Sequence, residues 1–350
     1  MKSPEKIKAV EFKDGFLYIL DQRILPLEEK YIKINSVSEA VFAIKNMAVR
    51  GAPAIGITAA YAYYIAWEKR KFSDKKDMLK SMAEQASFIK SARPTAVNLK
   101  WSVDRMHKKL NSLCAESAEK IKTALKKEAD SILTEQRIAD AEIGQKGTEL
   151  FKNKKSEPLS VMTHCNTGAL ATGGSGSAYG VIKTAHEKKL LKMVYASESR
   201  PLLQGARLTC YELEKDRIPY KLICDNAAAF IMKNKNIGLV ITGADRIAAN
   251  GDTANKIGTY SLALLADFHA IPFYVAAPVS SFDPEAKRGG NIEIEYRESS
   301  EVLNINQKRI APEGAKAENP AFDITPAGLI SAYITEIGII KNGEKIQQNA

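Results

Sequence analysis

The chain has 350 residues, 45% of them hydrophobic and 26% charged, which is the composition of a globular protein and excludes the disordered and fibrous classes. Its formal net charge is +10, from 51 lysines and arginines against 41 acidic residues. Because the lysines are interleaved with acids and not with aromatic residues, as in 119–127, we expect solvated basic faces and no nucleic-acid-binding stripe.

Features of export, membrane anchoring and metal binding are not predicted. The N-terminus runs into charged residues without the apolar stretch of a signal peptide, and the apolar run 53–67 is shorter than the ~20 residues of a membrane span. No histidines and carboxylates have metal-ligand spacing, and the cysteines stand far apart, at positions 114, 165, 210 and 224. We therefore expect a cytoplasmic protein that binds neither a membrane nor a metal.

The first part of the chain, residues 1–116, predicts a mostly helical domain with a small β-hairpin. Apolar and polar residues alternate over 10–26 around Asp14-Gly15, which is typical of a hairpin. Apolar residues at helical spacing then predict helix through 36–71 and 96–113.

A long connecting helix is predicted over residues 117–152. Four apolar residues recur there at helical spacing among many lysines and glutamates, namely Ile121, Leu125, Ala129 and Ile132. No proline interrupts the stretch before Pro158.

The remainder, residues 153–350, predicts an α/β fold. Short apolar runs alternate with helical stretches, which is typical of βαβ units that build a parallel sheet with helices on both faces. We expect a Rossmann-like domain whose strands include 159–163, 192–196, 221–224, 239–242 and 273–276.

Polar side chains follow three of these strands, where ligands of such sheets bind. The first strand leads into Thr163–Gly168, the second into Glu198–Gly205 and the fourth into Gly243–Arg246. We therefore expect a ligand site at this edge of the sheet.

Cys165 and Asp245 are the candidates for chemistry at that edge. A lone cysteine is commonly an inert small hydrophobe, but Cys165 lies after a strand and before a glycine-containing turn, where helix N–H groups favour a thiolate. Asp245 can act as a general acid in a dry pocket, or it can instead cap the next helix or pair with Arg246.

Three further features have a structural and a functional interpretation. The stretch 173–176, Gly-Gly-Ser-Gly, resembles a phosphate-cradling loop, and its alternative is a closely packed turn. Arg50 and Arg93 each precede an apolar helical segment and can bind a phosphate or a surface acid. His164 points away from its neighbour Cys165 and is interpreted as structural.

Several motifs together resemble the signature blocks of the methylthioribose-1-phosphate isomerase family, which shares its fold with regulatory subunits of a eukaryotic initiation factor's nucleotide exchanger. They occur in the family's order and span nearly the whole chain. The blocks are Arg50–Gly56, Arg93–Leu99, Thr163–Thr172, Ser199–Thr209, Gly243–Asp252, Asn255–Tyr260 and Asn319–Pro326.

The resemblance implies a cofactor-independent aldose-ketose isomerase of methionine salvage, usually a homodimer, which converts 5-methylthioribose 1-phosphate to 5-methylthioribulose 1-phosphate. It makes Cys165 and Asp245 the catalytic pair, which the initiation-factor subunits generally lack. The substrate-binding positions that it implies are Arg50, Gly51, Ala52, Arg93, Gln204, Asn255 and Lys256.

Alternatives to this function remain. Related enzymes isomerise 5-deoxyribose 1-phosphate or ribose 1,5-bisphosphate, and the sequence does not place the pocket walls that read the 5-substituent. A non-enzymatic subunit of the initiation-factor type is the other class. For the isomerase, proton transfer between C2 and C1 competes with a direct hydride shift.

Overall fold

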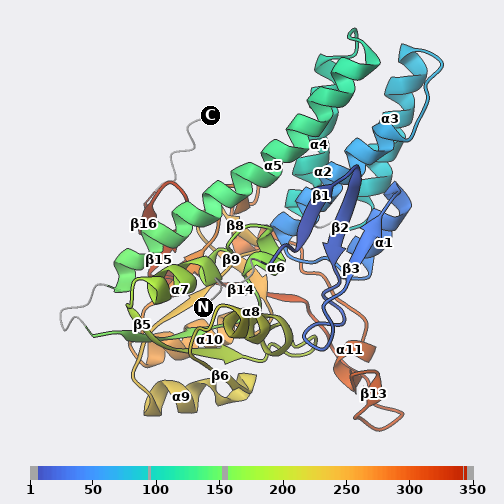
Figure 1. The fold of residues 1–350 in the computed structure, drawn as a ribbon. Coiled ribbons are helices and arrows are strands. Elements are labelled where there is room, and N and C mark those ends of the chain that lie inside the picture. The colour runs from blue at the N-terminus through green and yellow to red at the C-terminus, as the bar shows by residue number, and fades with distance from the viewer. Residues whose placement is uncertain (1–6, 94–95, 152–156, 342, 345–350) are drawn as a thin grey trace. The chain divides into compact units, whose positions relative to one another are not determined.

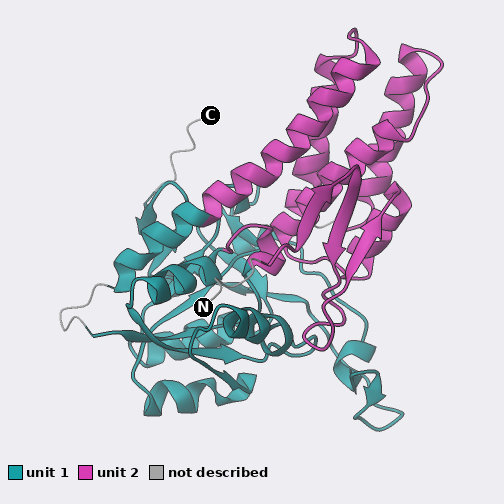
Figure 2. Ribbon diagram, in the orientation of Figure 1, with its two compact units in different colours: residues 1–5, 141–168, 177–350 teal, residues 6–140, 169–176 magenta. Residues whose placement is uncertain are grey.

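The computed structural model describes residues 7–93, 96–151, 157–341 and 343–344, and their elements are labelled in Figure 1. The chain divides into two compact units (Figure 2). Unit 1 takes in residues 141–168 and 177–350, and unit 2 takes in 6–140 and 169–176. The domain boundaries expected at residues 116 and 152 stay a prediction.

Unit 2 is mostly helical and carries a small antiparallel sheet. The predicted hairpin is confirmed as β1 and β2, and a third strand, β3, which the sequence analysis missed, pairs with β2. The bounds are β1 Val10–Lys13, β2 Phe16–Leu20, β3 Tyr31–Ile34, α1 Val37–Lys45, α2 Ala52–Glu68, α3 Lys75–Lys90, α4 Val97–Ser112 and α6 Ala169–Thr172. The long helix α5, Ala118–Gly147, has residues in both units and confirms that residues 117–152 contain a long helix, which ends at Gly147. Its role as the connection between two domains stays a prediction.

The expectation of continuous helix through 36–71 was wrong, because the chain breaks between α1 and α2. Gly51 has a φ of 92°, and a Cβ at this position would collide with the backbone of Ala171. Glycine accepts this conformation and this close approach, so α2 starts afresh after it. Every residue from Ala54 to Trp67 is buried, which makes α2 the central helix of unit 2.

Unit 1 contains a seven-stranded sheet within the described residues, in the order β16-β15-β10-β7-β4-β5-β6. All neighbours pair in parallel except β16, which is antiparallel to β15. The bounds are β4 Leu159–Thr163, β5 Leu191–Ser197, β6 Tyr220–Ile223, β7 Ile237–Thr242, β10 Phe273–Ala276, β15 Ala332–Ile334 and β16 Ile339–Lys341. The five predicted strands are therefore confirmed.

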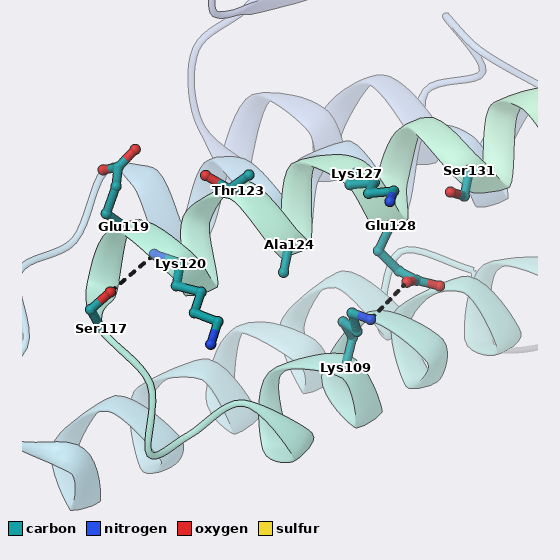
Figure 3. Close-up of a pocket in the computed structure, with 9 residues that line it drawn as sticks. All are labelled: Lys109, Ser117, Glu119, Lys120, Thr123, Ala124, Lys127, Glu128 and Ser131. Atoms are coloured by element: carbon teal, nitrogen blue, oxygen red, sulfur yellow. Dashed lines mark hydrogen bonds and ion pairs between the residues drawn. The ribbon is translucent and has the colours of Figure 1, made fainter.

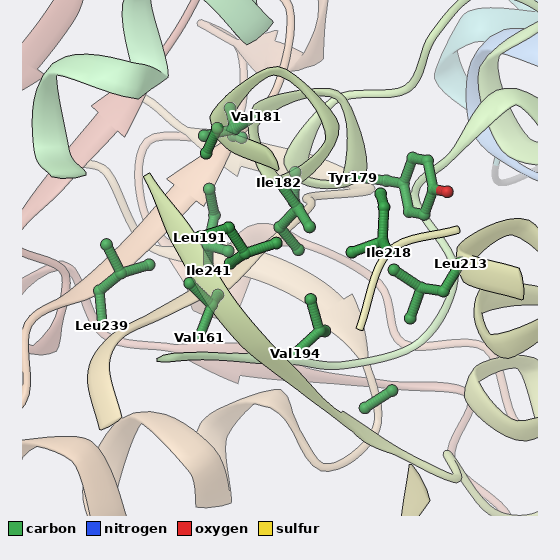
Figure 4. Close-up of a cluster of buried hydrophobic side chains, with 14 of the residues drawn as sticks. Val161, Tyr179, Val181, Ile182, Leu191, Val194, Leu213, Ile218, Leu239 and Ile241 are labelled. Carbon is green, nitrogen blue, oxygen red and sulfur yellow. The ribbon is translucent and has the colours of Figure 1, made fainter. Parts of the chain in front are cut away.

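Helices cover both faces of this sheet, as the fold class predicted. Leu239 and Ile241 of β7 pack in one apolar cluster with α7, Ala178–Glu187, and α8, Cys210–Lys215 (Figure 4). Val240, between them, packs in a second cluster with α9, Ala228–Asn234, and α10, Thr259–Phe268. Side chains of a strand point alternately to its two faces, and here both sets are apolar because both faces are covered.

A four-stranded sheet, in the order β11-β8-β9-β14, completes unit 1 among the described residues. Its strands are β8 Arg246–Ala248, β9 Thr253–Lys256, β11 Phe282–Asp283 and β14 Phe322–Thr325. A short helix, α11 Ser300–Leu303, and a hairpin of β12 Asn304–Ile305 and β13 Lys308–Arg309 lie between β11 and β14 in the chain. No helix in the described part of the chain is long and apolar enough to cross a membrane.

The glycine-containing loop 173–176 packs around a buried carboxylate, that of Asp140, which is the last residue of α5 in unit 2. Asp140 Oδ2 accepts hydrogen bonds from Thr172 Oγ1 at 2.6 Å and from the Gly176 N–H at 3.0 Å. Asp140 Oδ1 accepts one from Gln136 Nε2 at 2.7 Å. The loop therefore already has an internal anion as partner, which favours the closely packed turn over the phosphate-cradling interpretation.

Burial raises the pKa of the Asp140 carboxyl from its ordinary 3.8 to about 6, although its hydrogen bonds act in the opposite direction. Between pH 4 and 7 the unfolded state therefore binds fewer protons at this residue than the folded state does. The stability that the bound proton contributes is present below pH 4 and is lost as the pH rises through about 6.

We predict that the wild-type free energy of unfolding, relative to that of Asp140→Asn, falls as the pH is raised from about 4 to 7. The amide cannot ionise, so the variant has no titration at this position. Urea titrations of both proteins at several pH values measure the difference, and a difference independent of pH would contradict this account of Asp140.

Candidate functional site

The carboxyl ends of β4 and β7 form the centre of the candidate site. These two parallel strands are neighbours, with Thr163 beside Ile241. From β4 the chain proceeds to β5 and β6 on one side, and from β7 to β10 and β15 on the other. This reversal is a topological switch point, where sheets of this type leave a crevice for a ligand. Cys165 follows β4 and Asp245 follows β7, so their turns leave the same edge of the sheet.

Cys165 is held by its backbone in an uncommon conformation. Its φ is 60°, in the left-handed region that non-glycine residues rarely adopt, and the residue is 8% exposed. Its N–H donates to Ser199 Oγ at 2.8 Å, and its carbonyl oxygen accepts from Thr209 Oγ1 at 2.5 Å. The sequence analysis missed both hydroxyl groups as partners of this turn.

His164 is a buried structural residue. Its Nε2 lies 2.8 Å from the carbonyl oxygen of Ile257, which can only accept, so Nε2 carries the proton. Its Nδ1 then accepts from Ser197 Oγ at 2.6 Å. Burial lowers the pKa of the imidazole, which keeps it neutral. These bonds join the ends of three segments and agree with the structural interpretation of His164.

Asp245 is half-buried at the end of β7. Its N–H donates to the carbonyl of Ala254 at 3.0 Å, which ties the start of β8 to β9. Of the alternatives for Asp245, helix capping is wrong because a strand follows it. Arg246 forms an ion pair with Asp283 at 3.5 Å. Asp245 thus lies just after the strand end that the ligand rule singles out.

Gln204 carries a buried acceptor that no described residue satisfies. It lies directly before the π-helix Gly205–Thr209, which follows β5, and it is 4% exposed. Its Oε1 is buried without a hydrogen-bond partner among the described residues. Such an atom costs about 1–3 kcal/mol unless a ligand supplies a donor. This is the position predicted to bind substrate.

Asn255 and Lys256 lie on β9, where the chain turns into α10. Asn255 Nδ2 donates to Thr259 Oγ1 at 3.0 Å, and Lys256 Nζ donates to the Ala321 carbonyl at 2.9 Å. The ammonium also lies 4.6 Å from the centre of the Phe322 ring. Both predicted residues are therefore fixed by the four-stranded sheet and the first turn of α10.

Asp323 on β14 supports the same turn, although the sequence analysis gave it no role. Its carboxylate accepts from the Gly258 N–H at 2.7 Å and the Tyr260 N–H at 3.1 Å. Burial raises its pKa to about 6, against the effect of these bonds and of Lys256. Its only signal in the sequence was its place in the last motif block.

The remaining predicted positions belong to unit 2. The start of α2 contains the consecutive residues Arg50, Gly51 and Ala52. The Nε of Arg50 donates to Gln22 Oε1 at 3.2 Å. Arg93 lies between α3 and α4. A helix start that follows an arginine suits an anion.

A groove of about 640 Å³ elsewhere on unit 2, between α4 and α5, contains none of the predicted site residues (Figure 3). Lysines and glutamates line it together, and Lys109 lies 3.8 Å from Glu128 across it. This mixture of charges favours solvent over a phosphorylated ligand. Within the described ranges, no group of three or more His, Cys, Asp and Glu residues is arranged to hold a metal.

Comparisons with known proteins give the relatives of the chain. It is 50% identical over 334 residues to a methylthioribose-1-phosphate isomerase of Acetivibrio thermocellus, covering 95% of this chain and 96% of the relative. It is 47% identical to a protein of the same name from Syntrophotalea carbinolica, with 96% of each chain covered.

Two solved structures resemble the whole chain. The 5-methylthioribose 1-phosphate isomerase of Pyrococcus horikoshii OT3 matches with a TM-score of 0.90 and 41% identity, over 97% of this chain and 95% of that one. The translation initiation factor eIF-2B, subunit delta, of A. fulgidus matches with a TM-score of 0.85 and 38% identity, over 97% of both chains. Residues 48–342 match the model of the initiation factor 2 subunit family. The chain therefore belongs to the initiation factor 2 subunit family.

Proposed function

We propose that the chain is an aldose-ketose isomerase that converts 5-methylthioribose 1-phosphate to 5-methylthioribulose 1-phosphate in methionine salvage. The observation that carries the proposal is the placement of Cys165 and Asp245 after two adjacent strands at the switch point of the sheet. The names and the 46–50% identity of curated relatives support the substrate.

The substrate explains why an acid and a base are both needed. Its phosphate occupies the anomeric oxygen, so the ring cannot open through a free hemiacetal as in ordinary aldoses. A proton must reach the ring oxygen while the bond between C1 and that ring oxygen breaks. In the proposed mechanism Asp245 supplies that proton.

Cys165 is the base in this mechanism. Its sulfur takes the proton from C2 to leave an enediol-like intermediate, and returns it to C1, while Asp245 recovers a proton as the C2 hydroxyl becomes the ketone. Atoms and charges balance without a cofactor. Arg50, Arg93 and Lys256 bind the phosphate, and Gly51, Ala52, Gln204 and Asn255 bind the rest of the substrate.

Isomerisation of 5-deoxyribose 1-phosphate or ribose 1,5-bisphosphate is the alternative within the same chemistry. The alternative from another class is a protein-binding subunit. The 38% identity to the initiation-factor subunit of A. fulgidus supports this alternative. Turnover of the three phosphosugars, with the ketose detected by mass, separates all of these.

We predict that Cys165→Ser and Asp245→Asn each lower kcat on methylthioribose 1-phosphate by about 10²–10⁴-fold, the contribution of one acid or base. The ketose product is measured with purified proteins. Cys114→Ser and Asp14→Asn are the controls, because Cys114 follows α4 and Asp14 lies in the turn between β1 and β2, so neither residue follows a strand of the seven-stranded sheet. Wild-type turnover in both site variants would refute the catalytic pair, and absence of turnover on every phosphosugar in the wild type would refute the enzyme.

We predict that Gln204→Met lowers kcat/KM by about 5–150-fold, the equivalent of 1–3 kcal/mol, without lowering stability. The reason is that Gln204 Oε1 has no partner to lose among the described residues. Gln136→Met is the matched control, since it removes a bond to Asp140 and should lower stability and leave kcat/KM unchanged. A loss of stability at position 204 with unchanged kinetics would make Gln204 structural.

We further propose a cytoplasmic homodimer that binds no nucleic acid. The four cysteines are free of disulfides, as expected in a reducing compartment. Tyr260, Leu264 and Phe268 form an exposed apolar stripe on α10, and α9, which contacts α10, carries the exposed Phe230. Phe268 is 84% and Phe230 67% exposed, and such patches commonly mark contact surfaces.

We predict that lysine at both 264 and 268 converts the dimer to a monomer, because two buried charges without partners oppose the contact. Light scattering during size-exclusion chromatography measures the mass. Ile337→Lys, which changes an exposed apolar residue off the stripe, should leave the dimer intact. An unchanged dimer in the double variant would place the contact elsewhere.

A further inference from the structure

The turn that carries Cys165 is held by two buried hydroxyl groups from one segment of the chain. Ser199 and Thr209 are 0% and 2% exposed, and they lie 34 and 44 residues further along the chain than Cys165. One accepts from the N–H of Cys165 and the other donates to its carbonyl. The two peptide groups that set the conformation of Cys165 are thus both fixed.

Ser199 is itself fixed by a carboxylate. It also has a positive φ, of 63°, and its N–H donates to Asp225 Oδ1 at 2.8 Å. The N–H of Arg200 donates to Asp225 Oδ2 at 2.7 Å. Asp225, just after β6, therefore holds the hydroxyl of Ser199 in place against Cys165.

Thr209 is supported from the opposite side. Its Oγ1 accepts from Asn166 Nδ2 at 3.3 Å, and the same amide donates to Glu212, which is fully buried on α8. Since Oγ1 accepts from Asn166, its own proton is directed to the carbonyl of Cys165. The network runs from Glu212 through Asn166 and Thr209 to the backbone of Cys165.

We propose that Ser199 and Thr209 are positioning residues that hold Cys165 in the left-handed conformation and so aim its thiol for proton transfer. This inference rests on the proposed function of Cys165 as a base. A non-glycine residue leaves the left-handed region unless its surroundings keep it there. At Cys165, two hydroxyl groups form hydrogen bonds with the two flanking peptide groups. Both hydroxyl groups bond to the backbone of Cys165, so their assigned role is to position the thiol.

Thr209→Val tests the role, since it keeps the shape of the side chain and removes the hydroxyl. We expect kcat to fall about 10²-fold, as for a catalytic group misplaced by ~1 Å, with little change in KM. We expect alkylation of Cys165 by iodoacetamide, followed on its own peptide by mass spectrometry, to become about 3- to 10-fold faster as the turn loosens. Thr209→Ser should restore both.

Thr184→Val is the matched control, because the Thr184 hydroxyl also donates to a backbone carbonyl, that of Gly180, at 2.8 Å in α7. It should lower stability without changing kcat or alkylation of Cys165. Ser199→Ala is the second variant if Thr209→Val does not fold, with the same expected direction of both readouts.

Wild-type kcat and alkylation rate in the folded hydroxyl variants would overturn the positioning role. The alkylation readout needs no substrate, so it also separates the two proposals. If the wild type has no isomerase activity and Thr209→Val nonetheless speeds alkylation of Cys165, the proposed function is refuted. The two hydroxyl groups would then still be the groups that hold the turn.

Discussion

The parallel pairing of β4 with β7 is the constraint on which the candidate site depends. The chain leaves these neighbouring strands toward opposite sides of the sheet, so no crossover connection covers the edge between them. The two covered faces fix the register, because the apolar residues of β4 and β7 pack in one apolar cluster or the other. Packing in the core thereby determines where the turns of Cys165 and Asp245 emerge.

The polar side chains at this edge of the sheet form hydrogen bonds with backbone groups of the turns more than with other side chains. The buried hydroxyls hold the peptide groups of Cys165, and Asp225 and Asp323 each hold N–H groups of a turn. Carboxylates that accept from backbone N–H groups fix turns which lack regular structure. The catalytic side chains that we propose are thus presented by loops with rigid supports.

Much of this arrangement was predictable from local patterns. Buried parallel strands give continuous apolar runs, so β4 and β10 were predicted with their observed bounds, and the rule about strand ends then singled out Cys165 and Asp245. The four-stranded sheet of unit 1 was missed, because β9, Thr253–Lys256, has no alternation of apolar and polar residues. It becomes a strand by pairing with β14, which lies far along the chain.

The supports of the site were not predictable for a related reason. Thr209 becomes a partner of Cys165 only when the turn after β4 meets the π-helix after β5, and the sequence contains no periodicity that reports this contact. The unsatisfied oxygen of Gln204 is likewise a property of the packed structure, and Asp140 turned an apparent phosphate loop into a packed turn.

A crystal structure of the Cys165→Ser variant with methylthioribose 1-phosphate bound tests the central claim most directly. The account predicts the sugar at the carboxyl ends of β4 and β7, with the hydroxyl introduced at position 165 facing C2 and the Asp245 carboxyl facing the ring oxygen. A sugar bound away from this edge, or both groups turned from it, would contradict the account.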